Sequence, residues 1–305
     1  MPPSVCLAIS SFRNDDAVQK LLEAAAPLVP SLFSSIIVVD SLGTGRIAAL
    51  IDERGWSFAR YECARVNLGS AGNLARRLEL SAESGADYVY ALNHDGLLSP
   101  PAIEALVQAA SNNPRIGAAY PLRILPNRAR AYDVTNTSRL LLPRRTRPHA
   151  PSDATLTAYW GSSNGALYAL APVREGLSPW ADLWMGWEDL GYGWLLASRG
   201  YQQVIVRDAV FEDPYEFKVL PAAGGELYVT DKPAWYAYYF ARNLILIGGR
   251  LRPNWPVRAS LVCRIALECG ATTLLRSRKQ ERLRLLARGI IDGVRGVTGK
   301  LDRVP

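Results

Sequence analysis

The sequence predicts an α/β fold in which a mainly parallel sheet is flanked by helices. Three apolar runs, Val5–Ile9, Ile36–Val39 and Tyr88–Leu92, have the length and composition of buried strands. Helical apolar spacing follows the first run at residues 18–28, and a helix entered from a loop follows the second at residues 67–84. Strands that alternate with helices favour parallel pairing, because each helix carries the chain back across the sheet.

Each predicted strand ends in polar or small residues. In open α/β sheets, ligands bind at the edge formed by the carboxyl ends of the strands. The loops that we expect at this edge are residues 10–16, 40–45 and 93–96.

The remainder of the chain divides into an irregular part and a helical part. Residues 121–155 are rich in Arg, Pro, Asn and Thr and predict a long excursion with edge strands. We expect a helix at 188–199, a strand at 203–206, and mostly helix from Trp235 onward. The expected organisation is a catalytic domain at 1–230 and a basic helical segment at 231–305.

Composition narrows the class of protein. The chain has 305 residues, of which 49% are hydrophobic and 21% charged, as in an ordinary globular protein. Its four cysteines lack metal-binding spacing and are expected to be free thiols. The two histidines are far apart, which argues against a histidine-rich metal site. No secretory signal and no membrane-spanning run is evident, so we expect a cytoplasmic location.

The net charge of +7 is unevenly placed. Residues 250–305 hold 13 basic and 4 acidic residues, a net charge of +9, which leaves −2 for the rest of the chain. This asymmetry suggests an anionic partner for the C-terminal segment. A nucleic acid is the less favoured partner, because the basic residues are not interleaved with aromatic residues in a known module. If helical, residues 274–291 are basic and amphipathic, which suits either a membrane surface or packing on the catalytic domain.

Three motifs follow the predicted strands in order. The first strand ends in Ser10-Ser11-Phe12-Arg13, where hydroxyl groups and a ring can receive a nucleotide base. The helix at 67–84 begins with Asn67-Leu68-Gly69-Ser70-Ala71-Gly72-Asn73, whose glycines and free N–H groups suit a phosphate. The third motif is Asn93-His94-Asp95, in which the carboxylate can hold a divalent metal on a diphosphate.

Three further motifs lie in the second half. Trp187-Glu188-Asp189 starts a predicted helix, and either supplies a general base or complements the helix dipole. Gly161-Ser162-Ser163-Asn164-Gly165-Ala166 is a small-residue loop near several tryptophans, whose faces could stack on a sugar or pack in the core. A tyrosine-rich run ends at Arg242-Asn243, and this arginine either binds an anion or donates to backbone carbonyls.

Taken in order, these motifs resemble family-2 inverting glycosyltransferases, and among them the bacterial rhamnosyltransferase-like group. The resemblance covers residues 4–215 and a patch at 235–245. It implies the GT-A fold and transfer of a sugar, in this group a deoxyhexose such as rhamnose. The donor would be a nucleoside-diphosphate sugar, and the acceptor a glycan, a lipid-linked molecule or a small molecule. Mg²⁺ or Mn²⁺ would assist.

The resemblance also implies roles for individual residues. Asp189 is the expected base, Glu188 orients the acceptor or the base, and Asp95 binds the metal. Asp40 recognises the nucleoside; its alternative is a solvated turn residue. The other expected nucleotide-binding residues are Ser10, Ser11, Phe12, Arg13, Asn67, Gly69, Gly72, Asn73, Asn93 and His94. Those expected at the donor sugar or acceptor are Gly161, Ser162, Asn164, Trp187 and Arg242.

The sequence departs from the family in two places. Gly191 stands where relatives often have a further acid, and Glu212 or Asp213 stands where many have a metal-binding histidine. Asn93 and Gly191, which both stand where relatives often have acids, keep open a nucleotide-sugar-binding protein without transferase activity. A nucleotidyltransferase is a further alternative, but residues 10–16 lack its Gly-rich loop.

Overall fold

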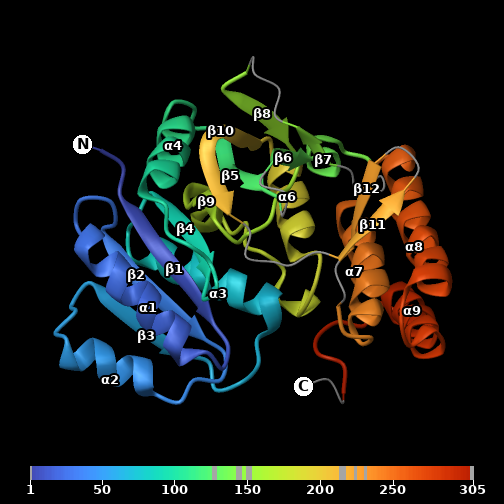
Figure 1. The fold of residues 1–305 in the computed structure, drawn as a ribbon, viewed down its shortest axis with the longest axis horizontal. Helices are drawn as coiled ribbons and strands as arrows, with labels where there is room; N and C mark the ends of the chain where they lie inside the picture. Colours follow the sequence, from blue (N-terminus) through green and yellow to red (C-terminus); the bar gives the residue numbers. More distant parts are fainter. Residues whose placement is uncertain are drawn as a thin grey trace.

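A computed structural model describes residues 2–125, 129–141, 146–148, 153–212, 218–222, 225–229 and 232–302. Within these ranges the main sheet has the strand order β3-β2-β1-β4-β9-β5-β10-β8, with β6 paired to β5 and β7 paired to β6 (Figure 1). Six strands of this order share one direction, whereas β9 and β8 run against their neighbours. The prediction of a mainly parallel sheet flanked by helices is confirmed.

The first half of the sheet is fully parallel and consists of β1 (Val5–Ser11), β2 (Ser35–Asp40), β3 (Ala59–Cys63) and β4 (Tyr88–Asn93). Its strands alternate between two cores with period two, as pleated backbone requires. Leu7 and Ile9 face one core, and Cys6 and Ala8 face the other. The crossover helices are α1 (Asp15–Ala25), α2 (Arg46–Glu53), α3 (Gly69–Glu83) and α4 (Pro100–Ser111).

The second half of the sheet contains the antiparallel strands. β9 (Ala166–Ala169) lies between β4 and β5 (Ile116–Ile124) and runs against both. The predicted excursion contains β6 (Arg130–Asp133) and β7 (Thr146–Pro148), and it ends where β8 (Thr155–Ala158) begins. β7 and β8 lie at edges of the described sheet, as expected, whereas β6 lies between β5 and β7. The strand predicted at 203–206 is longer, because β10 (Gln202–Glu212) pairs with β8 over its first part and with β5 to its end.

Shorter elements complete the described chain. They are η1 (Ala26–Leu28), η2 (Val134–Thr137), α5 (Ala171–Arg174), η3 (Ala181–Leu183), α6 (Glu188–Ser198), and the hairpin of β11 (Lys218–Ala222) and β12 (Gly225–Val229).

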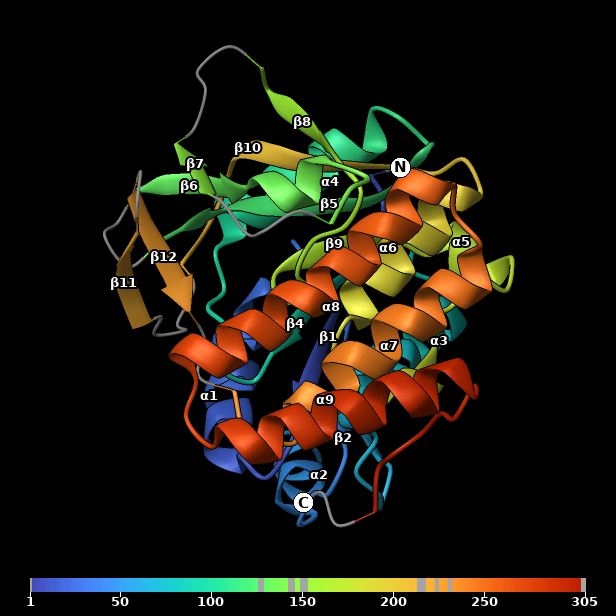
Figure 2. The same cartoon turned by 90° about the vertical axis from the view of Figure 1, so that its right-hand side faces the viewer.

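Three helices cover one side of the molecule: α7 (Tyr236–Leu251), α8 (Trp255–Leu275) and α9 (Lys279–Val294) (Figure 2). They share a hydrophobic core with α6, to which Leu190, Phe240, Leu261 and Leu286 contribute. The predicted domain boundary at 230/231 lies outside the described residues.

Close packing of α9 on α7 depends on one glycine. A Cβ at Gly289 would lie 2.3 Å from the carbonyl oxygen of Tyr238, so no larger residue fits at this distance.

Two smaller expectations concern cysteines and membranes. The four cysteines are free thiols. In the described part of the chain, no helix combines the length and apolar character needed to cross a bilayer.

Candidate active site

Hydrogen bonds join three of the predicted motifs at the carboxyl edge of the sheet. Ser10 and Asn93 are register partners on β1 and β4, and Ser10 Oγ donates to Asn93 Oδ1 at 2.9 Å. The backbone N–H of Asn93 in turn donates to Asn164 Oδ1 at 2.9 Å. The small-residue loop thus lies against the end of β4, because it leads into the neighbouring strand β9.

The same loop connects the strand end to the acidic pair on α6. The N–H of Ser163 donates to Asp189 Oδ1 at 3.2 Å, and the N–H of Gly165 donates to the carbonyl of Ala91 at 2.8 Å. Glu188 and Asp189 lie in the first turn of α6. Loop 161–166 therefore fixes the position of Asp189 relative to Asn93.

Burial changes the acidity of the carboxylate pair. Desolvation, reinforced by the charge of Glu188, raises the pKa of Asp189 to about 7, against hydrogen bonds from Ser163 that lower it. Desolvation likewise raises the pKa of Glu188, and a hydrogen bond that the Ser70 hydroxyl donates to this carboxylate acts in the opposite direction. A helix N-terminus alone would lower both pKa values. A carboxylate with a pKa near 7 is well suited to accept a proton at neutral pH.

One oxygen of this pair has no partner within the described chain. Glu188 Oε2 is buried and makes no hydrogen bond. A buried acceptor without a partner is costly, and such atoms in native proteins call for an explanation such as a ligand. A hydroxyl group of a bound ligand would satisfy it.

A buried arginine, Arg77, lies beneath the site and was not assigned a role from the sequence. Its guanidinium donates to the carbonyls of Ala8 and Leu92 at 3.2 Å each. Ala8 lies two residues before Ser10 in β1, and Leu92 directly precedes Asn93 in β4. Desolvation lowers its pKa to about 10, while the charges of Tyr168, Asp189 and Glu188 act in the opposite direction. The signal for this role was a basic residue on the inward face of α3, one turn after Asn73.

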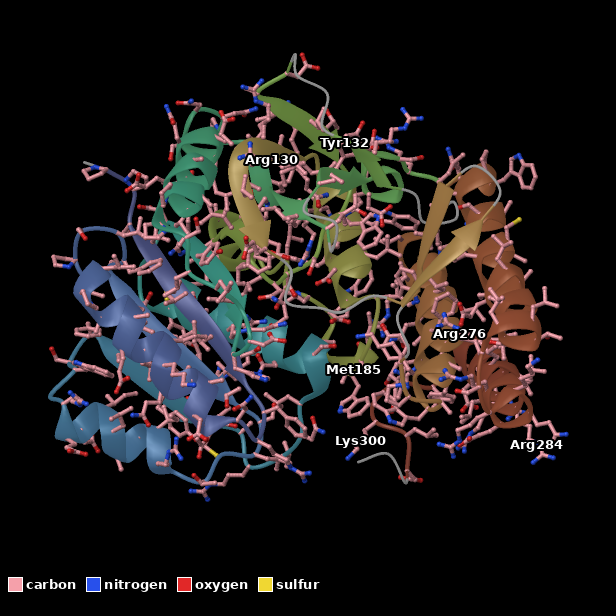
Figure 3. The ribbon with its side chains drawn as sticks, viewed as in Figure 1. Arg130, Tyr132, Met185, Arg276, Arg284 and Lys300 are labelled. Carbon is pink, nitrogen blue, oxygen red and sulfur yellow. The ribbon has the colours of Figure 1, made fainter. Side chains whose placement is uncertain are left out.

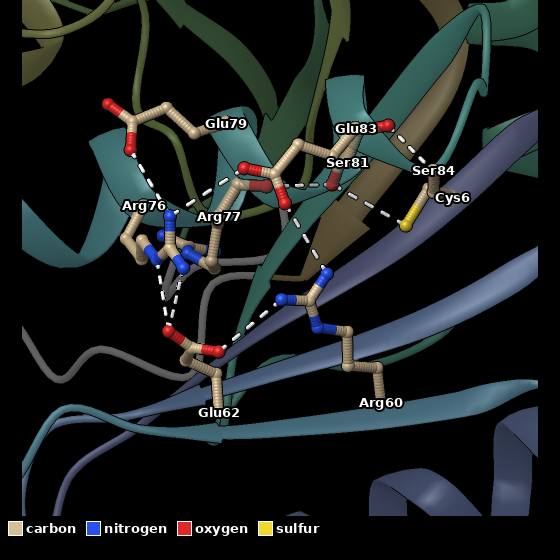
Figure 4. A network of polar contacts seen from close by, with 9 residues as sticks. All are labelled: Cys6, Arg60, Glu62, Arg76, Arg77, Glu79, Ser81, Glu83 and Ser84. Atoms are coloured by element: carbon tan, nitrogen blue, oxygen red, sulfur yellow. Dashed lines mark hydrogen bonds and ion pairs between the residues drawn. The ribbon is translucent and has the colours of Figure 1, made fainter.

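Asn73 is on the same inward face of α3. Its Nδ2 donates to the carbonyl of Val39 at 2.9 Å, and the residue is 4% exposed. Figure 4 shows Arg77 beside Arg76, which instead pairs with Glu62 at 2.7 Å on the surface of α3. The two adjacent arginines therefore have different roles. Arg77 binds backbone carbonyls near the ends of two strands, and Arg76 forms an ion pair on the surface of α3.

The glycine loop before α3 is held by Trp184. The N–H of Gly69 donates to Asn67 Oδ1 at 2.9 Å, and that of Ala71 donates to the carbonyl of Trp184 at 3.0 Å. Trp184 Nε1 donates to the carbonyl of Asn67 at 3.0 Å. The N–H groups of Gly69 and Ala71 are among those expected to bind phosphate, and both already donate hydrogen bonds within the chain. Gly72 follows them in α3.

Gly69 is required by this arrangement. Its φ is +66°, and a Cβ would lie 2.0 Å from the carbonyl oxygen of Trp184.

Asp40 is not the solvated turn residue that its alternative interpretation describes. It is fully buried and accepts hydrogen bonds from the N–H of Leu42 and the hydroxyl of Tyr61, both at 3.2 Å. Beside it, at the ends of β1 and β2, lies a hollow of about 290 Å³ lined by Arg13, Asn14, Asp15, Asp16, Leu42, Thr44 and Arg46. This volume is near the lower limit for small-molecule pockets, roughly 300 Å³.

The exposed residues Phe12 and Arg13 lie beside this hollow. The Arg13 guanidinium lies 5.2 Å from the centre of the Phe12 ring. Ser11, the last residue of β1, is buried and in register with Asp40. The residues expected to receive the nucleoside thus gather at one end of the sheet.

The predicted metal ligand Asp95 lies in an exposed turn. The N–H of Gly96 closes this turn on the carbonyl of Asn93 at 2.9 Å, and His94 is partly buried. Within the described ranges, no three His, Cys, Asp or Glu residues gather into a group that could hold a metal ion by itself. One carboxylate still fits Mg²⁺, which often binds through one or two carboxylates plus the phosphates of a substrate. Glu212 is exposed at the end of β10, and Asp213 lies outside the described residues.

Arg242 makes the backbone contacts described by its alternative interpretation. It is fully buried, and it donates to the carbonyls of Leu183 and Gly299 at 2.6 Å each and to Asn243 Oδ1 at 2.9 Å. These contacts replace the anion that the sequence suggested for this guanidinium.

The neighbouring residue Asn243 supports the chain just before the acidic pair. Its Nδ2 donates to the carbonyls of Met185 and Gly186 at 2.8 and 2.7 Å. Figure 3 shows Met185 between α3 and the C-terminal helices. Trp187 packs edge-on against the rings of Trp160 and Phe240, which is the core-packing alternative for this residue.

Comparison with known proteins identifies the fold. No family model and no curated protein matches the sequence. Residues 1–349 of S. aureus TarS share 11% identity with a TM-score of 0.59, over 95% of this chain and 81% of that one. The mannosyltransferase PcManGT from Pyrobaculum calidifontis, in complex with GDP-Man and Mn²⁺, shares 13% with a TM-score of 0.56, over 96% and 88%.

A third similar structure is GalNAc-T7 with UDP, GalNAc and Mn²⁺. It shares 11% identity with a TM-score of 0.58, over 88% of this chain and 57% of that one. These likenesses show that the chain has the GT-A fold, as predicted.

Proposed function

We propose that this protein is a glycosyltransferase that takes a sugar from a nucleoside-diphosphate donor and transfers it, with inversion, to a hydroxyl group. The observation that carries the proposal is the position of Asp189. Its carboxylate has a pKa of about 7 and is hydrogen-bonded to the loop that also contacts the end of β4. The GT-A fold, shared with a mannosyltransferase in complex with GDP-Man, supports the nucleotide-sugar donor.

In the proposed reaction the acceptor oxygen attacks the anomeric carbon while the bond to the diphosphate breaks. The proton of the acceptor hydroxyl passes to Asp189, and the nucleoside diphosphate leaves with the bonding electrons. Glu188 Oε2, which is buried and has no hydrogen-bond partner among the described residues, accepts a hydrogen bond from the acceptor and orients it.

Asp95 would hold a divalent metal together with the donor phosphates, at the carboxyl end of β4. Such a metal neutralises the charge that develops on the leaving diphosphate. Two of the similar structures contain Mn²⁺, which supports a metal of this kind, either Mn²⁺ or Mg²⁺.

The nucleoside would lie in the hollow beside Arg13 and Leu42. Ser10, Ser11, Phe12, Arg13 and Asp40 are proposed to contact it directly or to shape its site. Among donor sugars, a deoxyhexose such as rhamnose is favoured by the sequence resemblance, with membership of family 2 as part of the same proposal.

The test is a panel of nucleoside-diphosphate sugars that varies base and sugar, measured first by thermal stabilisation with and without Mn²⁺ or Mg²⁺. The best donor is then incubated with mixed glycan, lipid-linked and small-molecule acceptors. We expect metal-dependent stabilisation and acceptor-dependent release of nucleoside diphosphate. Stabilisation without release of nucleoside diphosphate, whichever acceptor is added, would favour a nucleotide-sugar-binding protein. Release of the sugar 1-phosphate, which is the leaving group when the nucleotidyl group is transferred from the donor, would indicate a nucleotidyltransferase.

A further inference from the structure

The outward face of α8 is apolar, and no other part of the described chain covers it. Its exposed side chains recur at intervals of three and four residues, which places them on one side of the helix. Trp255 is 77% exposed, Val262 67% and Leu274 77%. Together with these, the exposed members of the face are Cys263, Ala266, Leu267, Gly270 and Thr273.

This face is distinct from the one that packs on the protein. Val257, Leu261 and Ile265 of α8 are buried in the core shared with α7. The exposed face of α8, on the opposite side of the helix, therefore does not hold α8 in place. An apolar helix face of this size without a partner marks a site of interaction.

The outward apolar surface is formed by other residues than the sequence led us to expect. From the sequence, the leucines and isoleucines of residues 274–291 were equally suited to a membrane or to packing. Leu286 is buried, and Leu283, Leu285 and Ile290 pack against the same core. The packing interpretation thus applies to most of α9, and the exposed apolar surface comes mainly from α8, with Ile291 and Val294 added.

Basic residues surround this surface. Those on α8, α9 and the turn between them that are exposed are Arg258, Arg278, Lys279, Arg284, Arg288 and Arg295. The acids nearby are ion-paired: Glu268 lies 3.3 Å from Arg276, Glu281 lies 2.6 Å from Arg278, and Asp292 lies 3.5 Å from Arg288. Figure 2 shows α8 and α9 together on this face, and Figure 3 shows Arg284 at its outer edge.

We propose that the outward face of α8 and α9 docks on an anionic lipid surface. An apolar stripe with a basic border is the pattern of helices that lie in a membrane interface, where apolar side chains enter the acyl boundary and the cations meet lipid phosphates. A second copy of the chain is a poorer partner. A two-fold interface would place the same basic border against itself.

The first experiment is co-sedimentation of the full chain with vesicles of pure phosphatidylcholine or of phosphatidylcholine with phosphatidylserine. We expect binding to the anionic vesicles that weakens as salt is raised. The double variant Val262→Glu, Leu274→Glu should bind about tenfold more weakly or worse, because it places charge on the apolar stripe. Val66→Glu is the matched control, since Val66 is 58% exposed away from this face.

The second experiment uses Cys263 as a reporter within the stripe. Cys63 and Cys269 are replaced by Ser and Cys263 is labelled with an environment-sensitive fluorophore, whose emission should shift to the blue on anionic vesicles. Circular dichroism confirms that each variant is folded. No binding to anionic vesicles by folded wild-type protein would overturn the proposal, as would unchanged binding by the double variant. A dimer that the double variant disrupts, with no vesicle binding, would assign the face to a second copy. None of these measurements depends on transferase activity.

Discussion

The backbone N–H of Ser163 donates to Oδ1 of Asp189 at 3.2 Å, and this contact joins the two halves of the candidate active site. The loop that contains Ser163 also contacts Asn93 at the end of β4 through Asn164. The proposed base is thereby held at a fixed position relative to the strand end that precedes Asp95.

The raised pKa of Asp189 predicts opposite effects of pH on rate and on stability. Because a base must be deprotonated, turnover should rise with pH and level off above about 7. The folded protein binds this proton more tightly than the unfolded chain, so the contribution of Asp189 to the free energy of unfolding should fall as pH rises from 3.8 to about 7. Urea unfolding at pH 5 and 8 checks the second effect, which Asp189→Asn should diminish.

Arg77 is predicted to position the site through the two strands that it contacts. Arg77→Met leaves the carbonyls of Ala8 and Leu92 without this donor and should lower the free energy of unfolding by about 1–3 kcal/mol for each. Loss of the buried cation should also raise the pKa of Asp189, which moves the pH–rate profile to higher pH. The matched control is Arg76→Met, whose surface pair with Glu62 should contribute about 1 kcal/mol or less. Equal effects of the two changes, or an unshifted pH profile for Arg77→Met, would contradict this role.

Asp95→Ala is expected to weaken nucleotide binding only when metal is present. Titration calorimetry with the nucleoside diphosphate, in Mn²⁺ and in EDTA, measures both conditions on one variant. If Asp95 is the metal ligand, the difference between them should shrink. An unchanged difference would assign the metal to other groups.

Gly289→Ala should destabilise the protein, because a Cβ there would lie 2.3 Å from the carbonyl oxygen of Tyr238 and force α9 away from α7. Gly270→Ala is the matched control on α8, since nothing lies within 4 Å of its added Cβ. In an exposed helix this change should raise the free energy of unfolding by up to about 1 kcal/mol. Thermal unfolding of the two variants side by side separates packing from helix propensity.

The parallel half of the sheet was predictable because its strands are long apolar runs closed by polar residues. The alternation of such runs with helical spacing identifies β1, β2 and β4 and the edge where their loops meet. The length of β10 was not predictable, because its last residues pair with β5 after a shift in register between Val206 and Val210. Such a shift depends on the partner strand, which local sequence does not specify.

In the candidate site, too, some features could be predicted from the sequence and others could not. Motif order placed the acidic pair at the start of α6, where the structure has it. The sequence did not show whether Arg242 binds an anion or donates to backbone carbonyls. Both interpretations are compatible with an arginine that follows a tyrosine-rich run. Its burial against the carbonyls of Leu183 and Gly299 comes from the docking of distant segments. Arg77 was missed for a related reason: a basic residue in a helix is ordinarily a surface residue, and here the helix turns it toward the sheet.

The most direct test of the proposed function compares wild-type protein with Asp189→Asn in a transfer assay using the best donor from the panel. Asp208→Asn, an exposed change elsewhere, is the control. NMR of the wild-type product should show an anomeric configuration opposite to that of the donor. Asp189→Asn should lower turnover by about two orders of magnitude or more, with donor affinity nearly unchanged. Turnover close to wild type in Asp189→Asn, or a product that retains the donor configuration, would contradict the account.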